Sequence, residues 1–85
     1  MDVKNIKETE FEEEKSYWNI KMLSHYNLAI ELEYLKKFGE SKKHYLLAKE
    51  IAHVNKKKNQ NIINTIDESV KRIEEDEQQQ KKKLI

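Results

Sequence analysis

Large side chains recur at helical spacing along most of the chain, in three stretches separated by short polar segments. In the first stretch, the residues that recur every seven positions are Phe11, Trp18, His25 and Leu32. Met22 and Ala29 fall at the i+4 positions of the same stripe. A stripe with this spacing lies on one face of a helix. The pattern therefore predicts a first helix from about Asn5 to Lys37.

A turn and a second helix are expected next. Gly39 is the only glycine, and glycine readily adopts the positive φ that commonly ends a helix. The second helix then runs from about Glu40 to Asn55. Its inner stripe comprises Tyr45, Ala48, Ile51 and Ala52. Phe38, next to the turn, is expected either to fold back onto the hairpin or to face a partner.

A third helix is expected to begin near Gln60, after a polar connection capped by Asn59 or Asn61. Its narrow apolar face comprises Ile62, Ile63, Ile66, Val70 and Ile73. Beyond Ile73 the chain is fully polar, and it either extends this helix through i,i+4 charge pairs or forms a frayed tail. The chain has no proline and no sustained alternation of apolar and polar residues. The prediction is an all-α fold.

The spacing within residues 22–55 resembles the tetratricopeptide repeat (TPR), a helix-turn-helix unit. The matching positions, predicted to form the hairpin packing, are Leu28, Ala29, Leu32, Ser41, Tyr45 and Ala48. Two positions depart from the family pattern: His25 stands where a large apolar residue is common, and His53 stands where proline often ends the repeat. The segment also looks like the last repeat of long TPR proteins from ciliated protists. The alternative is an unrelated helical hairpin.

The resemblance implies an organisation in three parts. Residues 1–21 extend the first helix, residues 22–55 form the TPR-like hairpin, and residues 56–85 form a capping helix with a charged tail. TPR proteins stack several repeats into a continuous core, whereas this chain has one. Either the flanking helices complete a three-helix bundle, or the unit docks onto another protein.

Size and composition favour docking. The chain has 85 residues, of which 36% are hydrophobic and 39% are charged, and its mean hydropathy is −1.03. A core of this size rarely contributes more than about 3 to 5 kcal/mol. There is no cysteine, so no disulfide adds to it. A partner protein is therefore expected to supply the remaining stability.

The charge balance argues against several other ligands. The net charge is +1, so no global field steers the chain to nucleic acid or membrane. Lysine dominates the basic residues and Arg72 is the only arginine, which disfavours phosphate or base recognition. The Lys56–Lys58 and Lys81–Lys83 runs either touch an anionic surface or serve solubility. No apolar run is long enough for a membrane span, and the acidic N-terminal region is unlike a transit peptide. We expect a cytoplasmic protein.

No catalytic, cofactor-binding or metal-binding constellation is predicted. The histidines are His25, His44 and His53, and no pair has the spacing of a zinc protease motif. Neighbouring carboxylates such as Glu31 and Glu33 point in different directions on a helix and are expected to be solvated. The chain is therefore expected not to be an enzyme, and no small-molecule substrate is expected.

Aromatic residues are the candidates for a partner interface. Adjacent Tyr17 and Trp18 cannot both face one core, and aromatic side chains are enriched at interfaces. The predicted partner interface comprises Phe11, Tyr17, Trp18, Tyr34 and Phe38. The alternative is that these side chains lie along the hairpin itself.

Together these features predict a non-catalytic protein–protein interaction or assembly subunit of a larger complex. The family resemblance implies a ciliary or axonemal setting. One alternative is a small accessory subunit of a mitochondrial complex or a ribosome. Another is a helical partner of a calcium sensor, although the many acidic residues suit such a target poorly.

Overall fold

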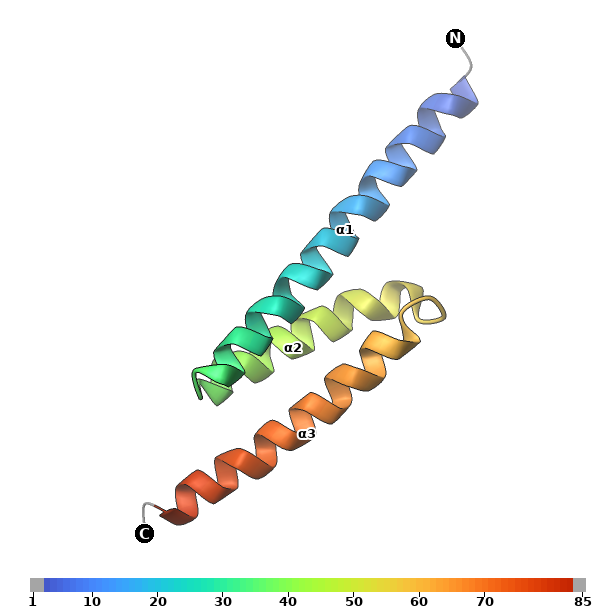
Figure 1. The fold of residues 1–85 in the computed structure, drawn as a ribbon. Coiled ribbons are helices and arrows are strands. Elements are labelled where there is room, and N and C mark those ends of the chain that lie inside the picture. Colours follow the sequence, from blue (N-terminus) through green and yellow to red (C-terminus); the bar gives the residue numbers. More distant parts are fainter. Residues whose placement is uncertain (1–2, 84–85) are drawn as a thin grey trace.

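The structure, a computed structural model, describes the backbone of residues 3–83 and the side chains of residues 15–82. It contains the helices α1 (Val3–Tyr34), α2 (Phe38–Ala52) and α3 (Gln60–Lys83), with a short 3-10 turn, η1 (His53–Asn55), after α2 (Figure 1). Residues 3–83 include no β-strand. The predicted all-α fold is confirmed.

Helix α2 is the centre of the arrangement. It packs against α1 as an antiparallel hairpin and against α3 on its other side. α1 and α3 run in the same general direction and have few contacts with each other (Figure 1). α1 continues past the end of α2 towards its own N-terminus, so the hairpin has a closed end at the turn and an open end near Trp18.

The turn between α1 and α2 differs from the prediction. The residue with positive φ is Lys36, at 61°, and no glycine has positive φ. The Lys37 amide donates to the Leu32 carbonyl and the Lys36 amide donates to the Glu33 carbonyl, both at 2.9 Å. These two bonds define a Schellman motif, which requires a left-handed residue at the position of Lys36. The prediction that Gly39 ends the first helix was wrong.

Gly39 instead lies in the first turn of α2, one residue after the helix begins at Phe38. A Cβ atom placed on it would meet nothing within 4 Å. At the other end of α2, the Asn59 side chain donates to the Ala52 carbonyl at 3.2 Å. Asn59 therefore caps the end of α2 with its side chain, while its own carbonyl accepts from the Ile63 amide as α3 begins.

The core follows the small-residue pattern of the hairpin and the isoleucine stripe of α3. Its buried hydrophobic residues are Met22, Ala29, Tyr45, Ala48, Ala52, Ile63, Ile66 and Ile73. Ala29 and Ala48 allow α1 and α2 to approach closely, and the buried Ser41 hydroxyl donates to the Ala29 carbonyl at 2.7 Å. Isoleucines then cover the α3 side of α2.

The polar end of the chain remains helical. α3 continues ten residues beyond Ile73, to Lys83, so the structure has the helix extension rather than the frayed tail. Glu77, within this extension, pairs with Lys42 of α2 at 2.6 Å. Asp67 pairs with Lys49 of α2 at the same distance. Ion pairs therefore flank the apolar contact between α2 and α3.

Candidate protein-interaction site

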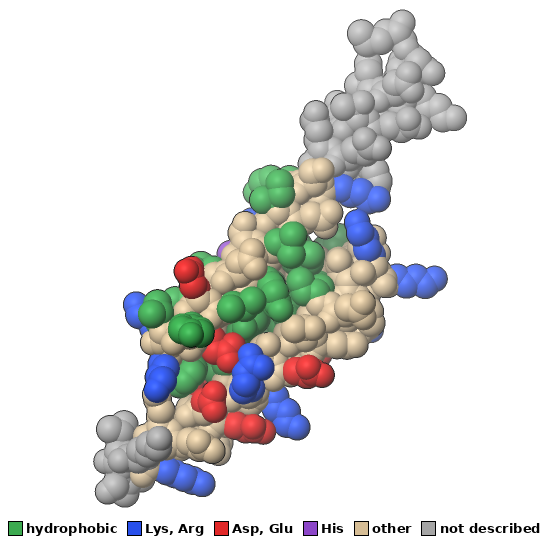
Figure 2. Space-filling model, viewed as in Figure 1, with side chains coloured by type: hydrophobic (Ala, Val, Ile, Leu, Met, Phe, Trp, Pro, Cys, Tyr) green, Lys and Arg blue, Asp and Glu red, His purple; other side chains and the backbone are tan. Residues whose placement is uncertain are grey.

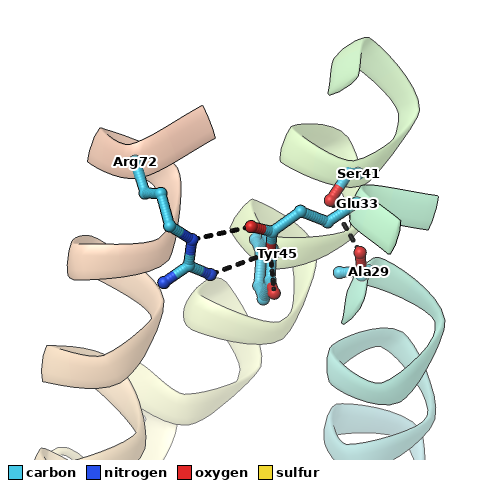
Figure 3. A network of polar contacts seen from close by, with 5 residues as sticks. All are labelled: Ala29, Glu33, Ser41, Tyr45 and Arg72. Atoms are coloured by element: carbon cyan, nitrogen blue, oxygen red, sulfur yellow. Dashed lines mark hydrogen bonds and ion pairs between the residues drawn. The ribbon is translucent and has the colours of Figure 1, made fainter. Parts of the chain in front are cut away.

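A polar network joins all three helices near the closed end of the hairpin (Figure 3). The buried Tyr45 hydroxyl of α2 donates to Glu33 Oε1 of α1 at 2.9 Å. From α3, Arg72 Nε donates to Glu33 Oε2 at 2.7 Å and Arg72 Nη2 donates to Glu33 Oε1 at 2.9 Å. This bidentate pair links α3 directly to α1.

Contacts within this network, together with burial, set the protonation states of Glu33 and Tyr45. The hydrogen bond from Arg72 lowers the pKa of Glu33, although burial acts in the opposite direction. Burial, and then the hydrogen bond to Glu33, raise the pKa of Tyr45 to about 12. Tyr45 therefore stays a donor and Glu33 a charged acceptor at neutral pH. The network therefore links the three helices through hydrogen bonds from one neutral and one charged donor to Glu33.

Two histidines meet across the α1–α2 contact. The Nδ1 atoms of His25 and His44 are 2.9 Å apart, and their rings stack with centroids separated by 5.1 Å. Desolvation, followed by the nearby His44 and Lys21, lowers the pKa of His25. Among the described residues, no group of three or more histidines, aspartates or glutamates is placed to hold a metal ion.

Helix α1 exposes large apolar side chains on the sides that neither α2 nor α3 covers. Those on α1 are Tyr17, Trp18, Ile20, Leu23, Leu28, Ile30 and Tyr34. Figure 2 shows hydrophobic side chains gathered over the middle of the molecule, with charged side chains around them. A helix that is apolar on most of its circumference is normally buried, so this part of α1 is suited to contact with another protein.

A groove lies at the open end of the hairpin, where α1 and α2 separate. It has a volume of about 380 Å³, and its apolar lining comprises Trp18, Met22, Ile51 and Val54. Asn19, Asn55 and Lys58 are among the polar residues that line it. A second hollow on the other side of Trp18 shares Ile51 and Val54 with the first. Trp18 therefore stands between two apolar depressions.

The aromatic residues beside the groove form a small cluster. The rings of Tyr17 and Trp18 meet edge to face with centroids 5.3 Å apart. The Lys21 ammonium lies 5.3 Å from the Trp18 ring centroid and 5.9 Å from that of Tyr17. The cluster offers large, amphipathic contact area next to an apolar depression, which is the typical composition of an interface anchor.

The structure buries most, but not all, of the residues predicted to form the hairpin packing. Ala29, Ser41, Tyr45 and Ala48 are buried between the helices, and Leu32 is half-buried. Leu28 is 40% exposed, because it lies about 100° around α1 from Ala29 and faces away from α2.

The residues predicted to form the partner interface differ in exposure and in position along the chain. Tyr17, Trp18 and Tyr34 are exposed, but Tyr34 lies some 24 Å along α1 from the other two. Phe38 is half-buried and packs against the core, so of its two predicted positions it takes the one on the hairpin. The side chain of Phe11 lies outside the described residues.

Sequence reasoning missed two features. The exposed residues Ile20, Leu23 and Ile30 form a second stripe on α1, which a search for more than one apolar period would have revealed. The Arg72–Glu33 pair joins residues 39 positions apart, and the only signal was that Arg72 is the sole arginine.

Two further findings concern membrane-spanning helices and similarity to known proteins. Among the helices of the described chain, none combines the length and the apolar character that a bilayer crossing requires. Comparison of the chain with protein-family models, with curated proteins and with solved structures finds no match.

Proposed function

We propose that this protein is a non-catalytic assembly component that docks onto a larger protein through the open end of its hairpin. The observation that carries the proposal is the apolar groove beside the exposed Tyr17–Trp18 cluster. Val54, on the opposite wall, is 83% exposed. A partner that inserts an apolar side chain or helix between Trp18 and Val54 would remove this surface from water.

The shape of the backbone supports the need for a partner. The radius of gyration is 17.1 Å, compared with about 12 Å for a globular domain of this length. The three helices therefore form an elongated arrangement in which α1 projects beyond α2 (Figure 1).

The family resemblance gives the proposal a setting. A TPR-like terminal hairpin would place this chain in a cytoplasmic, ciliary or axonemal complex, and this setting rests on the resemblance alone. The rival setting is a mitochondrial complex or a ribosome, where Lys56–Lys58 would contact RNA. Docking through the Trp18 groove would change little with salt, whereas RNA contact would weaken steeply as salt rises.

The proposal can be tested by quantitative capture from native extract with tagged wild-type and variant chains. Val54→Asp alters an exposed residue of the groove lining, and Tyr17→Ala removes the exposed ring that contacts Trp18. Each should reduce the captured partner at least about tenfold without loss of helicity. Tyr34→Ala is the matched control, because it removes an exposed aromatic residue from the same helix far from the groove. Equal capture by all four chains would show that the groove is not the docking site.

Trp18 also provides a direct optical test. It is the only tryptophan in the chain, and it lines the groove. When the captured partner is purified and added back, burial of the indole should shift its fluorescence to shorter wavelength. A partner that binds without changing this emission would have to contact another surface.

A further inference from the structure

A second stripe of α1 has the spacing of a coiled-coil seam. We call it the outer seam, and it comprises Ile20, Leu23, Asn27, Ile30 and Tyr34. Successive members are three, four, three and four residues apart, and all five are exposed. At about 100° per residue the seam occupies some 80° of the helix circumference. Its centre is turned about 130° from Met22 and Ala29, which face α2.

The residue types in the outer seam fit a particular partner geometry. With Ile20, Asn27 and Tyr34 at a positions, Leu23 and Ile30 fall at d positions. In parallel coiled coils an isoleucine at a with a leucine at d, as in Ile20 and Leu23, favours two strands, whereas an isoleucine at d, as in Ile30, favours more. A single asparagine at a fixes the register, because it pairs with its counterpart and is costly opposite an apolar residue.

We propose that the outer seam binds a second copy of this chain, with the two α1 helices parallel and in register. Asn27 of each copy then lies beside Asn27 of the other. A second copy suits the seam because its polar centre and apolar flanks are complementary to themselves in this register only.

The residues beside the seam agree with this arrangement. In a parallel pair, each g position faces the next e position of the other helix. Asn19 then faces Ser24, and Tyr26 faces Glu31, so no like charges oppose each other across the contact. Glu33, at the following g position, already pairs with Arg72 within its own chain.

Trp18 falls at an f position and faces away from the outer seam. Asn19 of the groove lining and Tyr17 of the aromatic cluster fall at g and e positions beside the seam. Val54→Asp is therefore the variant that tests docking without altering the dimer contact. The seam covers only about two heptads, and short coiled coils are weak. We therefore expect a weak dimer that forms at high protein concentration and dissociates on dilution.

Sedimentation equilibrium of the full chain over a wide range of protein concentrations tests the proposal. Leu23→Glu should weaken dimerisation at least about tenfold. Leu28→Glu is the matched control, because Leu28 is 40% exposed and Leu23 is 46% exposed on the same helix. Leu28 lies on a different side, so its variant should dimerise like the wild type. Circular dichroism on each variant would show that α1 is intact.

A variant that is expected to strengthen self-association provides a second test. Asn27→Ile replaces the polar layer with an apolar one and should tighten self-association at least about tenfold, with loss of a unique oligomeric state. A wild-type chain that stays monomeric throughout would overturn the proposal. If Leu23→Glu and Leu28→Glu had equal effects on dimerisation, the outer seam would not be the contact surface. If Asn27→Ile did not tighten self-association, the proposed pairing of Asn27 with Asn27 would be wrong.

Disulfide cross-linking tests the parallel orientation. The chain has no cysteine, so Leu23→Cys introduces a single thiol at the seam. In the parallel register this thiol lies next to its counterpart and should cross-link rapidly under mild oxidation, whereas an antiparallel pair would separate the two thiols. Leu28→Cys is the control, and equal rates for both variants would contradict the proposed arrangement.

Discussion

The two interfaces of α2 are built on different principles. Towards α1, the contact depends on small residues: Ala29, Ser41 and Ala48 are fully buried, and a serine hydroxyl reaches a backbone carbonyl of the opposite helix. Towards α3, the contact depends on the apolar area of isoleucines, with Lys49–Asp67 and Lys42–Glu77 at its edges. The first depends on close fit and the second on area and charge.

This difference predicts how each interface fails. Close fit leaves no room for a larger side chain, but it responds little to salt. Area and ion pairs tolerate small changes in shape, but exposed ion pairs weaken with salt and acid. The hairpin should therefore be the more robust unit, and α3 the part that separates first.

The largest effect is expected from a charge at the tight contact. Ala29→Glu places a carboxylate where the wild-type side chain is 0% exposed, and it should reduce the free energy of unfolding by more than about 4 kcal/mol. Ser24→Glu is the control, because it introduces the same side chain at an exposed position of the same helix. Wild-type helicity and thermal stability in Ala29→Glu would refute the close packing.

A cavity in the α2–α3 interface should have the next largest effect. Ile66 is fully buried, and Ile66→Ala should cost about 2 to 5 kcal/mol. Hydrogen exchange should show loss of protection in α3 before α1 and α2. Ile62→Ala, at a half-buried position, should cost less. An equal loss of protection across all three helices would show that the two interfaces do not separate.

Removal of the link between α3 and α1 should have a smaller effect. Arg72→Met deletes the bidentate pair with Glu33, and because the Arg72 side chain is 54% exposed the expected cost is about 1 kcal/mol. The variant should also respond less to salt than the wild type. Chemical denaturation at low and at high salt measures both effects.

Acid provides a second measure of the same link. The pKa of Glu33 is lowered from 4.5, so its stabilising contribution is complete above pH 4.5 and is lost as the pH falls through the lowered value. Stability should therefore decrease below pH 4.5 in the wild type and less steeply in Arg72→Met. Identical acid profiles would mean that the pair contributes nothing to stability.

The smallest effects are expected at the turn that joins α1 and α2. Lys36 has a φ of 61°, which strains an L-residue, so Lys36→Gly should stabilise the protein by about 1 kcal/mol. Gly39→Ala should also stabilise it, by about 0.5 kcal/mol, because Gly39 is helical and has free space around it. Thermal unfolding of the two variants measures both changes, and destabilisation by Gly39→Ala would indicate that Gly39 has a special conformation.

The helices and the tight hairpin contact could be predicted because they follow from local periodicity. Ala29 and Ala48 stand at regular spacings from their large neighbours, and the start of α3 at Gln60 follows a polar segment. The turn could not be predicted in the same way. Its position depends on where α1 stops bonding to itself, and this occurs at a lysine although a glycine lies three residues away.

The candidate site was only partly predictable, because exposure depends on what the rest of the chain covers. Trp18 was singled out by its residue type, but its position beside a groove requires Val54, which comes from a distant segment. Leu28 has the spacing of a packing residue, but the structure provides no neighbouring helix on its side of α1.

The contact between His25 and His44 has a consequence for the folding reaction itself. The two Nδ1 atoms share one hydrogen bond, and desolvation at this contact lowers the pKa of His25 from 6.5. Between the lowered value and pH 6.5, the closed hairpin therefore holds fewer protons on His25 than the open chain does. Closure of the hairpin is then a proton-releasing reaction, and acidification opposes it by mass action.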